Sequence, residues 1–166
     1  MNTKLFFIFF DLSKITIIRD VAWFLSYPMQ YILPLGIIAW VLWKSPRKIF
    51  ALSLLFLSGF CTWLATLVLK QIFMIPRPFL YLGITPVVSE TNFSFPSNHA
   101  SFFAALAVVT LFLDKRVGIF VSACAVLIGF SRIVLGVHTP LDIFAGFCLG
   151  ICISFFFIKI FTHKTI

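Results

Sequence analysis

Long apolar stretches alternate with short polar segments along most of the chain. Five of these stretches are about 20 residues long, the length that a helix needs to cross the hydrocarbon core of a bilayer. Their approximate bounds are Asp20 to Trp43, Ile49 to Leu69, Ser97 to Leu113, Val117 to Val137 and Leu141 to Phe161. Pro28 and Pro34 interrupt the first stretch, and a transmembrane helix accommodates such prolines as kinks. The pattern predicts an all-α, polytopic transmembrane helix bundle with about five spanning helices.

Residues 1–19 do not continue this pattern. Leu5 to Phe10 is strongly apolar, but charged residues on both sides leave it too short for a confident span. We expect residues 1–19 to form an amphipathic helix at the membrane interface, with a short sixth helix as the alternative. The N-terminal segment also lacks the cleavage site of a removable signal peptide. We therefore expect a single integral-membrane domain over residues 1–166, with the helix bundle in residues 20–166.

The composition agrees with a membrane protein and argues against several other classes. Hydrophobic residues make up 61% of the chain and charged residues 11%, which leaves no segment for a separate soluble domain. The formal charge is +8, but the basic residues are scattered between apolar stretches, so we expect membrane lipids and phosphate as partners and no nucleic acid. Cys61, Cys124, Cys148 and Cys152 lie inside apolar stretches and lack the spacing of disulfide or zinc sites. We interpret them as small buried hydrophobic side chains and expect no metal.

Basic residues in three short segments predict the orientation of the chain. They are Lys44, Arg47 and Lys48 after the first stretch, Lys115 and Arg116 after the third, and Lys159 and Lys164 at the C-terminal end. Short basic loops remain on the cytoplasmic side of a membrane. The segment from about Lys70 to Pro96 and the turn around His138 then face the opposite side. We expect a multi-pass protein of the plasma or inner membrane with an outward or periplasmic site.

A group of polar residues near the outward ends of the spans is not explained by topology. The group consists of Lys70, Arg77, Ser97, Asn98, His99, Ser131, Arg132, His138 and Asp142. Three permanent cations can surround the oxygens of a phosphate and stabilise its charge without a metal. Arg132 lies inside an apolar stretch, where an ionisable side chain costs about 2.5 to 3.5 kcal/mol, so it needs a partner or a function. The group has the inventory of a phosphoryl-transfer site.

The spacing of the remaining residues predicts how they cooperate. Ser97 can cap the third helix, and the first-turn amides near Asn98 and His99 then form an anion site. Asp142 follows His138 by four residues, which places the two side chains on one helix face if the fifth helix begins near His138. The carboxylate can then orient the imidazole as in a catalytic triad. His99 has no carboxylate partner in the sequence, so it is the better general acid.

Each of these residues has a simpler interpretation when it is taken alone. A single lysine at the end of a span, such as Lys70, is usually an anchor at the membrane surface. A single histidine at an interface is more often structural than catalytic, and we assign His163 no role. Glu90 reads as a solvated loop residue. These interpretations do not explain why three cations, two histidines and a carboxylate occur together.

Three segments of the chain resemble the signature of the type 2 phosphatidic acid phosphatases, which is Lys-x6-Arg-Pro, Pro-Ser-Gly-His and Ser-Arg-x5-His-x3-Asp. The matching segments are Lys70 to Pro78, Pro96 to His99 and Ser131 to Asp142, in this order and with intact internal spacing. One position departs from the signature, because Asn98 stands where the family has glycine. Asparagine is the non-glycine residue that best tolerates a left-handed backbone, so we expect the amide cradle to persist.

The resemblance implies roles for individual residues. Lys70, Arg77, Ser97 and Arg132 would hold the phosphate with Asn98 beside them, and His138 would attack phosphorus. His99 would protonate the leaving group, and Asp142 would support His138. A covalent phosphohistidine and independence from metals or other cofactors are also implications of the resemblance.

The resemblance leaves several substrates open. The stretch Ser-Phe-Pro-Ser-Asn-His-Ala, residues 94–100, is most similar to small bacterial undecaprenyl-diphosphate phosphatases. Phosphatases or phosphotransferases that act on phosphatidylglycerophosphate, phosphatidic acid or lipid A use the same motifs. A membrane transporter or flippase that binds lipid headgroups is the non-enzymatic alternative. The favoured prediction is a membrane lipid phosphatase that acts on undecaprenyl diphosphate.

Overall fold

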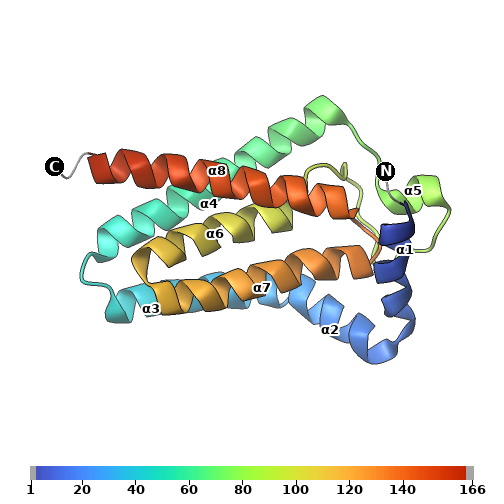
Figure 1. Cartoon of the computed structure of the whole chain (residues 1–166), viewed down its shortest axis with the longest axis horizontal. Coiled ribbons are helices and arrows are strands. Elements are labelled where there is room, and N and C mark those ends of the chain that lie inside the picture. The colour runs from blue at the N-terminus through green and yellow to red at the C-terminus, as the bar shows by residue number, and fades with distance from the viewer. Residues whose placement is uncertain (1–2, 164–166) are drawn as a thin grey trace.

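The computed structural model describes residues 3–163, and all the regular secondary structure in this part of the chain is helical (Figure 1). The prediction of an all-α bundle is therefore confirmed. In chain order the helices are α1 (Thr3–Phe10), the 3-10 helix η1 (Asp11–Lys14), α2 (Thr16–Ser26), α3 (Met29–Lys44), α4 (Lys48–Phe73), α5 (Pro78–Leu82), α6 (Asn98–Leu113), α7 (Lys115–Val134) and α8 (Pro140–His163).

The five apolar stretches correspond to the long helical segments of the structure. Within residues 3–163, three segments are apolar and long enough to cross a membrane, namely Lys48–Leu82, Lys115–Val134 and Pro140–His163. The helices α2 and α3 meet that criterion together, with a bend of 49° between them. The bend falls at Tyr27 and Pro28, whereas Pro34 lies inside α3. Helix α6 is apolar but has only 16 residues, and it runs through the middle of the bundle.

Two helix boundaries differ from the sequence prediction in a way that matters for the site. Helix α4 continues to Phe73, which places Lys70 inside its last turn. Helix α7 ends at Val134, three residues earlier than expected, because Gly136 adopts a left-handed conformation with φ of 81°. The turn between α7 and α8 is therefore long enough to carry His138 outside both helices.

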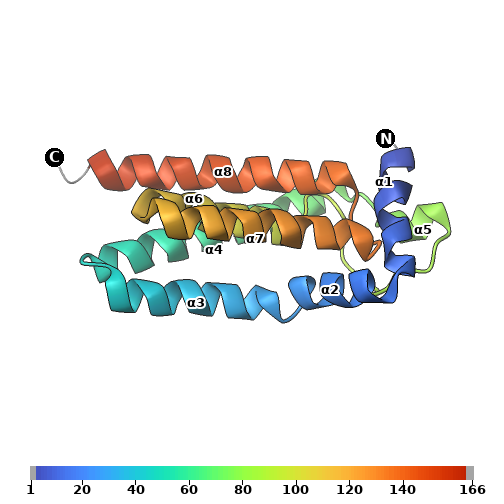
Figure 2. The ribbon, with the colours of Figure 1, turned by 60° about the horizontal axis from the view of Figure 1, so that its bottom comes forward.

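The N-terminal helix α1 lies across the end of the bundle (Figures 1 and 2). Its Phe6 is fully buried in a cluster with Ala100 and Ile133. Eight residues of α-helix extend over only about 12 Å, too short to cross a bilayer. The predicted boundary between the N-terminal segment and the helix bundle, after residue 19, was wrong, because helix α2 of the bundle already begins at Thr16. Placement of α1 in the membrane interface stays a prediction.

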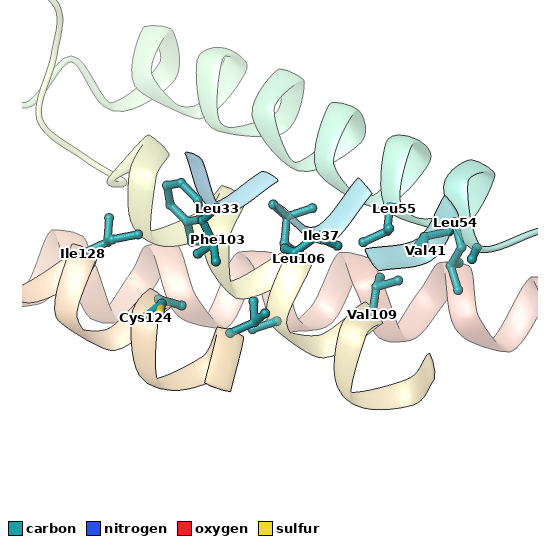
Figure 3. Packing of buried hydrophobic residues seen from close by; sticks show 14 residues of the cluster. Leu33, Ile37, Val41, Leu54, Leu55, Phe103, Leu106, Val109, Cys124 and Ile128 are labelled. Carbon is teal, nitrogen blue, oxygen red and sulfur yellow. The ribbon is translucent and has the colours of Figure 1, made fainter. Parts of the chain in front are cut away.

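Helix α6 forms the centre of the bundle, and the other long helices pack around it. Figure 3 shows the main core, in which α3, α4, α6 and α7 contribute interlocking apolar side chains. On the other side, α8 approaches α6 through a stripe of small residues. A Cβ atom at Gly146 would lie 2.7 Å from the carbonyl oxygen of Ser97. This close approach holds the beginnings of α6 and α8 together, where two of the signature segments lie.

The interpretation of the cysteines was only partly right. Cys124 is buried in the core and Cys61 is partly buried, but Cys148 and Cys152 are exposed on α8. The small residues of α8 occupy the face that packs on α6, so the two thiols point away from the bundle. All four cysteines are free.

The basic segments that predict the orientation of the chain lie at one end of the bundle. The turn between α3 and α4, the turn between α6 and α7 and the end of α8 lie at one end (Figure 2). The basic residues that predict a cytoplasmic location therefore gather at this end, except Lys164, which lies outside the described residues. The loop after α4 and the turn with His138 lie at the opposite end, which is the arrangement that the orientation rule predicts.

Candidate active site

The turn that carries His138 is fixed by local capping interactions. Asp142 Oδ2 accepts a hydrogen bond from the backbone N–H of Thr139 at 2.7 Å, and Thr139 Oγ1 accepts one from the N–H of Asp142 at 3.3 Å. This reciprocal pair is a capping box at the beginning of α8, where Pro140 occupies the first helical position. The sequence Thr-Pro-Leu-Asp thus starts a helix and positions a carboxylate beside His138.

Asp142, His138 and Ser94 form a buried hydrogen-bonding group. The Oδ2 atom of Asp142 lies 3.5 Å from Nδ1 of His138, which confirms the expected proximity of the two side chains. Ser94 Oγ donates to the same Oδ2 atom at 2.6 Å and lies 3.3 Å from Nδ1 of His138. Ser94 therefore touches both members of the pair, and the sequence reasoning did not single it out.

The surroundings of His138 define which ring nitrogen carries the lone pair. Arg77 Nη1, which can only donate, lies 3.1 Å from Nε2 of His138. Nε2 therefore accepts, and the ring proton resides on Nδ1, where Ser94 and Asp142 can accept it. Burial lowers the pKa of His138 below its ordinary value, although the hydrogen bond to Asp142 opposes this shift. A neutral imidazole with its lone pair on Nε2 is the form that can act as a nucleophile.

The two signature arginines meet at a shared carboxylate. Arg77 Nη2 forms an ion pair of 2.5 Å with Oε2 of Glu90, and Arg132 Nη2 pairs with Oε1 of the same residue. Arg132 is completely buried, and its Nε and Nη1 atoms have no hydrogen-bond partner among the described residues. The partner that Arg132 requires inside an apolar helix is therefore Glu90, and two of its donors remain available.

The interpretation of Glu90 as a solvated loop residue was wrong. Its side chain is only 23% exposed and it bridges two buried guanidinium groups. Burial would raise the pKa of Glu90, but Arg132 and Arg77 lower it to about 2, so the carboxylate stays ionised. The signal that could have identified Glu90 was the unmatched charge of two arginines in an apolar protein.

Backbone carbonyl oxygens hold Arg77 and Lys70, most of them from the loop between α5 and α6. Arg77 Nε donates to the carbonyl oxygen of Asn92 at 2.9 Å, and its Nη1 donates to the carbonyl oxygen of Val137 at 2.9 Å. Lys70 Nζ donates to the carbonyl oxygens of Phe93 and Ser94, the latter at 3.1 Å. The structure thus brings Lys70, Arg77, Arg132, His138 and Asp142 together around this loop, as the sequence predicts.

The residues at the beginning of α6 form the other side of the site. Ser97 is the N-cap, and its Oγ accepts from the N–H of Ala100 at 3.5 Å, as expected. The Ser97 N–H donates to the carbonyl oxygen of Asp142 at 3.0 Å and joins α6 to α8. Asn98 has a buried Oδ1 atom without a hydrogen-bond partner among the described residues. His99 Nε2 lies 3.1 Å from Oε1 of Gln30.

Two neighbouring cavities lead from His99 towards the outside of the bundle. The first, of about 160 Å³, is lined by Asn98, His99 and Gln30 together with Trp63 and Phe102. The second, of about 530 Å³, is an apolar groove between α3, α4 and α6, and it shares Trp63 and Phe102 with the first. The described residues contain no group of three or more His, Cys, Asp or Glu side chains that could hold a metal ion.

Comparisons with known proteins identify relatives of the chain. It is 40% identical to a phosphatidylglycerophosphatase B of Bacillus subtilis over 90 residues, which cover 48% of this chain and 44% of that protein. It is 38% identical to an undecaprenyl-diphosphatase of Sulfolobus acidocaldarius over 88 residues, which cover 51% and 42% of the two chains. The chain thus spans less than half the length of these two relatives. The crystal structure of Aquifex aeolicus LpxE has the same fold, with a TM-score of 0.81 at 24% identity over 95% of this chain and 94% of that chain.

A family comparison covers the larger part of the sequence. Residues 47–166 match the PAP2 superfamily. This region contains every residue of the predicted site, from Lys70 to Asp142, and all the helices from α4 to α8. The protein belongs to the PAP2 superfamily.

Proposed function

We propose that the protein is a membrane lipid phosphatase that hydrolyses a lipid phosphate or diphosphate, with undecaprenyl diphosphate as the substrate. The observation that carries this proposal is the buried pairing of His138 with Asp142 and Ser94, directly beside Arg77 and close to Arg132. A site that only bound a headgroup would need the cations but not an oriented, neutral imidazole. The membrane transporter or flippase is therefore the weaker alternative.

In the proposed reaction His138 is the nucleophile and His99 is the general acid. The lone pair on Nε2 of His138 attacks the terminal phosphorus, a nitrogen–phosphorus bond forms, and the bond between that phosphorus and the leaving oxygen breaks. The leaving oxygen bridges the two phosphates in a diphosphate and belongs to the lipid alcohol in a monophosphate. His99, on the opposite side, donates a proton to the leaving oxygen. Water then attacks the phosphohistidine and gives up a proton to His99, and the nitrogen–phosphorus bond breaks. This step returns the lone pair to Nε2 of His138 and releases inorganic phosphate. Arg77, Arg132 and Lys70 stabilise the charge on the phosphoryl oxygens in both steps, with Ser97 and Asn98 at the start of α6 beside them.

The shape of the protein supports a lipid as the carrier of the phosphate. The apolar groove opens between α3 and α4, on surfaces that the composition assigns to the bilayer, and it continues through Trp63 and Phe102 to His99. A hydrocarbon chain in this groove would place its headgroup at the beginning of α6. The leaving oxygen would then lie on the side of His99, as general acid catalysis requires.

The relatives support two candidate headgroups. Proteins named undecaprenyl-diphosphatase and phosphatidylglycerophosphatase B both resemble this chain, at 38% and 40% identity. We favour the diphosphate because Asn98 replaces the family's glycine at the beginning of α6, where its side chain can reach a second phosphate. Hydrolysis of phosphatidylglycerophosphate is the second candidate, favoured by the similarity to the Bacillus subtilis protein.

A panel of lipid phosphates tests the proposal. The purified protein in detergent is given undecaprenyl diphosphate, phosphatidylglycerophosphate, phosphatidic acid and lipid A, and release of inorganic phosphate is measured with a chelator present. We expect the fastest release from undecaprenyl diphosphate, and no release by His138→Ala. Equal release by His138→Ala would contradict the mechanism. Tight binding of these lipids without any phosphate release would favour a transporter or flippase.

A further inference from the structure

We propose that Glu90 is an internal competitor of the substrate phosphate, and that it makes the site selective for phosphates anchored by a lipid chain over free phosphate. This inference rests on the proposed phosphatase function for its role in catalysis. Its structural basis is independent of that function, because it depends only on which anion the two arginines hold.

The Glu90 carboxylate lies where the motif residues would hold a phosphoryl group. Its two oxygens are divided between Arg77 and Arg132, one to each guanidinium group. Arg77 in turn contacts Nε2 of His138, so the carboxylate and the nucleophile share a neighbour. A planar carboxylate with one oxygen on each arginine imitates two of the oxygens of a bound phosphate.

The burial of the cluster implies that Glu90 leaves when a phosphate enters. Arg77 and His138 are each 2% exposed and Arg132 is fully buried, whereas Glu90 is 23% exposed. Glu90 is therefore the member of the cluster that faces the outside. A phosphate dianion and an ionised carboxylate repel each other strongly when both lie within contact distance of the same arginines.

The local backbone allows such an exchange. The loop is anchored before Glu90 by a hydrogen bond from the Val87 N–H to the carbonyl oxygen of Leu135 at 3.1 Å. After Glu90 it is anchored at Asn92 by Arg77 and at Ser94 by a bond to the carbonyl oxygen of Ile75. Between these anchors, the backbone of residues 88–91 makes no hydrogen bond to the backbone of any described residue. Glu90 can therefore move out while the anchors of the loop at Val87, Asn92 and Ser94 stay in place.

Competition with Glu90 lowers the apparent affinity of the site for every phosphate ligand. Apparent affinity falls in proportion to the fraction of protein in which the site is accessible, so each ligand must outcompete Glu90. A lipid phosphate gains additional free energy from the apolar groove beside His99, and this energy offsets the cost of displacement. Inorganic phosphate, which is also the product, lacks that contribution. Two donors of Arg132 without a partner are ready to receive the phosphate once Glu90 has left.

Calorimetric titration with inorganic phosphate tests the competition directly. The purified protein is compared with Glu90→Gln, Glu90→Asp and the control Asp20→Asn. This control removes a carboxylate whose ion-pair partner among the described residues is its neighbour Arg19. We expect the Kd for phosphate to fall by about tenfold or more in Glu90→Gln, which corresponds to Glu90 occupying the site about nine-tenths of the time. Glu90→Asp keeps the charge but is too short to bridge both arginines, so its Kd should be intermediate. Asp20→Asn should not differ from wild type.

Activity measurements extend the test to selectivity. In Glu90→Gln, the ratio of kcat/KM for a short-chain soluble phosphate monoester to that for a lipid phosphate should rise, and phosphate should become a stronger inhibitor. Unchanged or weaker phosphate binding in a folded Glu90→Gln protein would overturn the inference and would indicate a counterion with a purely structural role. Titrations in the His138→Ala background need no turnover. Glu90→Gln could tighten phosphate binding in the His138→Ala background while the wild-type protein shows no phosphatase activity. That result would support competition between Glu90 and phosphate and would reject the proposed function.

Hydrogen exchange on the wild-type protein covers the case in which the Glu90 variants do not fold. Saturating inorganic phosphate or orthovanadate should speed amide exchange in residues 88–91, because Glu90 is released. Exchange in the first turn of α6 should slow, because its amides hold the anion. Unchanged or slower exchange in residues 88–91 in the presence of bound anion would contradict the displacement of Glu90.

Discussion

The two ends of the bundle carry cations in opposite environments. At one end Lys44, Arg47 and Lys48 are exposed, and none of them forms an ion pair with a described residue. At the other end Lys70, Arg77 and Arg132 are at most 3% exposed and are held by carbonyl oxygens and a carboxylate. Exposed cations remain hydrated, and their positive charge alone is enough to orient a membrane protein. Buried cations act through geometry, so their replacement has larger and more specific effects.

Among the substitutions that compare the buried end with the exposed end, Asp142→Asn should cause the largest loss of activity. The amide cannot accept as a carboxylate does from His138 Nδ1, Ser94 and the N–H of Thr139, so the imidazole loses its tautomer and orientation. We expect kcat to fall by about a hundredfold or more. Steady-state phosphate release from the best lipid substrate measures this effect. A kcat within a few fold of wild type would mean that the pair is structural only.

Arg132→Lys should cause the second largest loss of activity. The substitution keeps the positive charge but removes the planar fork, including the two nitrogen atoms that have no partner beside Glu90. We expect kcat/KM to fall by between about tenfold and a hundredfold. The same substitution at the other end, Arg47→Lys, is the matched control and should leave kcat/KM unchanged. Equal effects at both positions would mean that only the sign of the charge matters.

Ser94→Ala should have a smaller effect. Ser94 acts as a positioning residue through Asp142 and His138, and one hydrogen bond is worth about 1 kcal/mol, which corresponds to roughly a fivefold loss. The loss should appear in kcat and leave KM unchanged. Ser154→Ala is the control. Ser154 is a similarly buried serine in the second half of α8, and it donates to the carbonyl oxygen of Ala105 on α6. A change in KM without a change in kcat would assign Ser94 to substrate binding.

Neutralisation of the exposed end should have the smallest effect on the purified enzyme. The double substitution of Lys44→Gln and Arg47→Gln removes two exposed charges, and we expect kcat/KM in detergent to stay within about twofold of wild type. The orientation in cells is the more sensitive property, and accessibility labelling of the loop between α3 and α4 measures it. A large loss of activity in detergent would show that the two ends are coupled.

The features of the protein that could be predicted from sequence are those with a regular pattern. Apolar stretches gave the long helices, and motif spacing located Lys70, Arg77, Arg132, His138 and Asp142 around one site. The rest depended on contacts that spacing does not encode. Glu90 and Ser94 lie in an irregular loop, where no periodicity indicates which side chains turn inward. The unmatched charge of Arg77 and Arg132 indicated that a carboxylate partner was needed, and the structure identified Glu90 as that partner.

The exposed cysteines illustrate a second limit. In a soluble protein the polar face of a helix reveals which side is buried, but α8 is apolar on all sides because one of its faces meets lipid. Hydrophobicity therefore could not separate Cys148 and Cys152, which point outward, from Cys124 in the core. The stripe of small residues at Gly146, Gly150 and Ser154 was the available signal, because close helix packing requires small side chains.

Trapping of the covalent intermediate tests the role of the buried end most directly. The wild-type protein is mixed with a lipid diphosphate that carries a radiolabelled terminal phosphate, quenched rapidly in alkali and separated by gel electrophoresis. We expect label on the protein in an alkali-stable and acid-labile linkage at His138, and none on His138→Ala under the same conditions. Phosphate release at the wild-type rate by His138→Ala, or label that persists on that variant, would contradict His138 as the nucleophile.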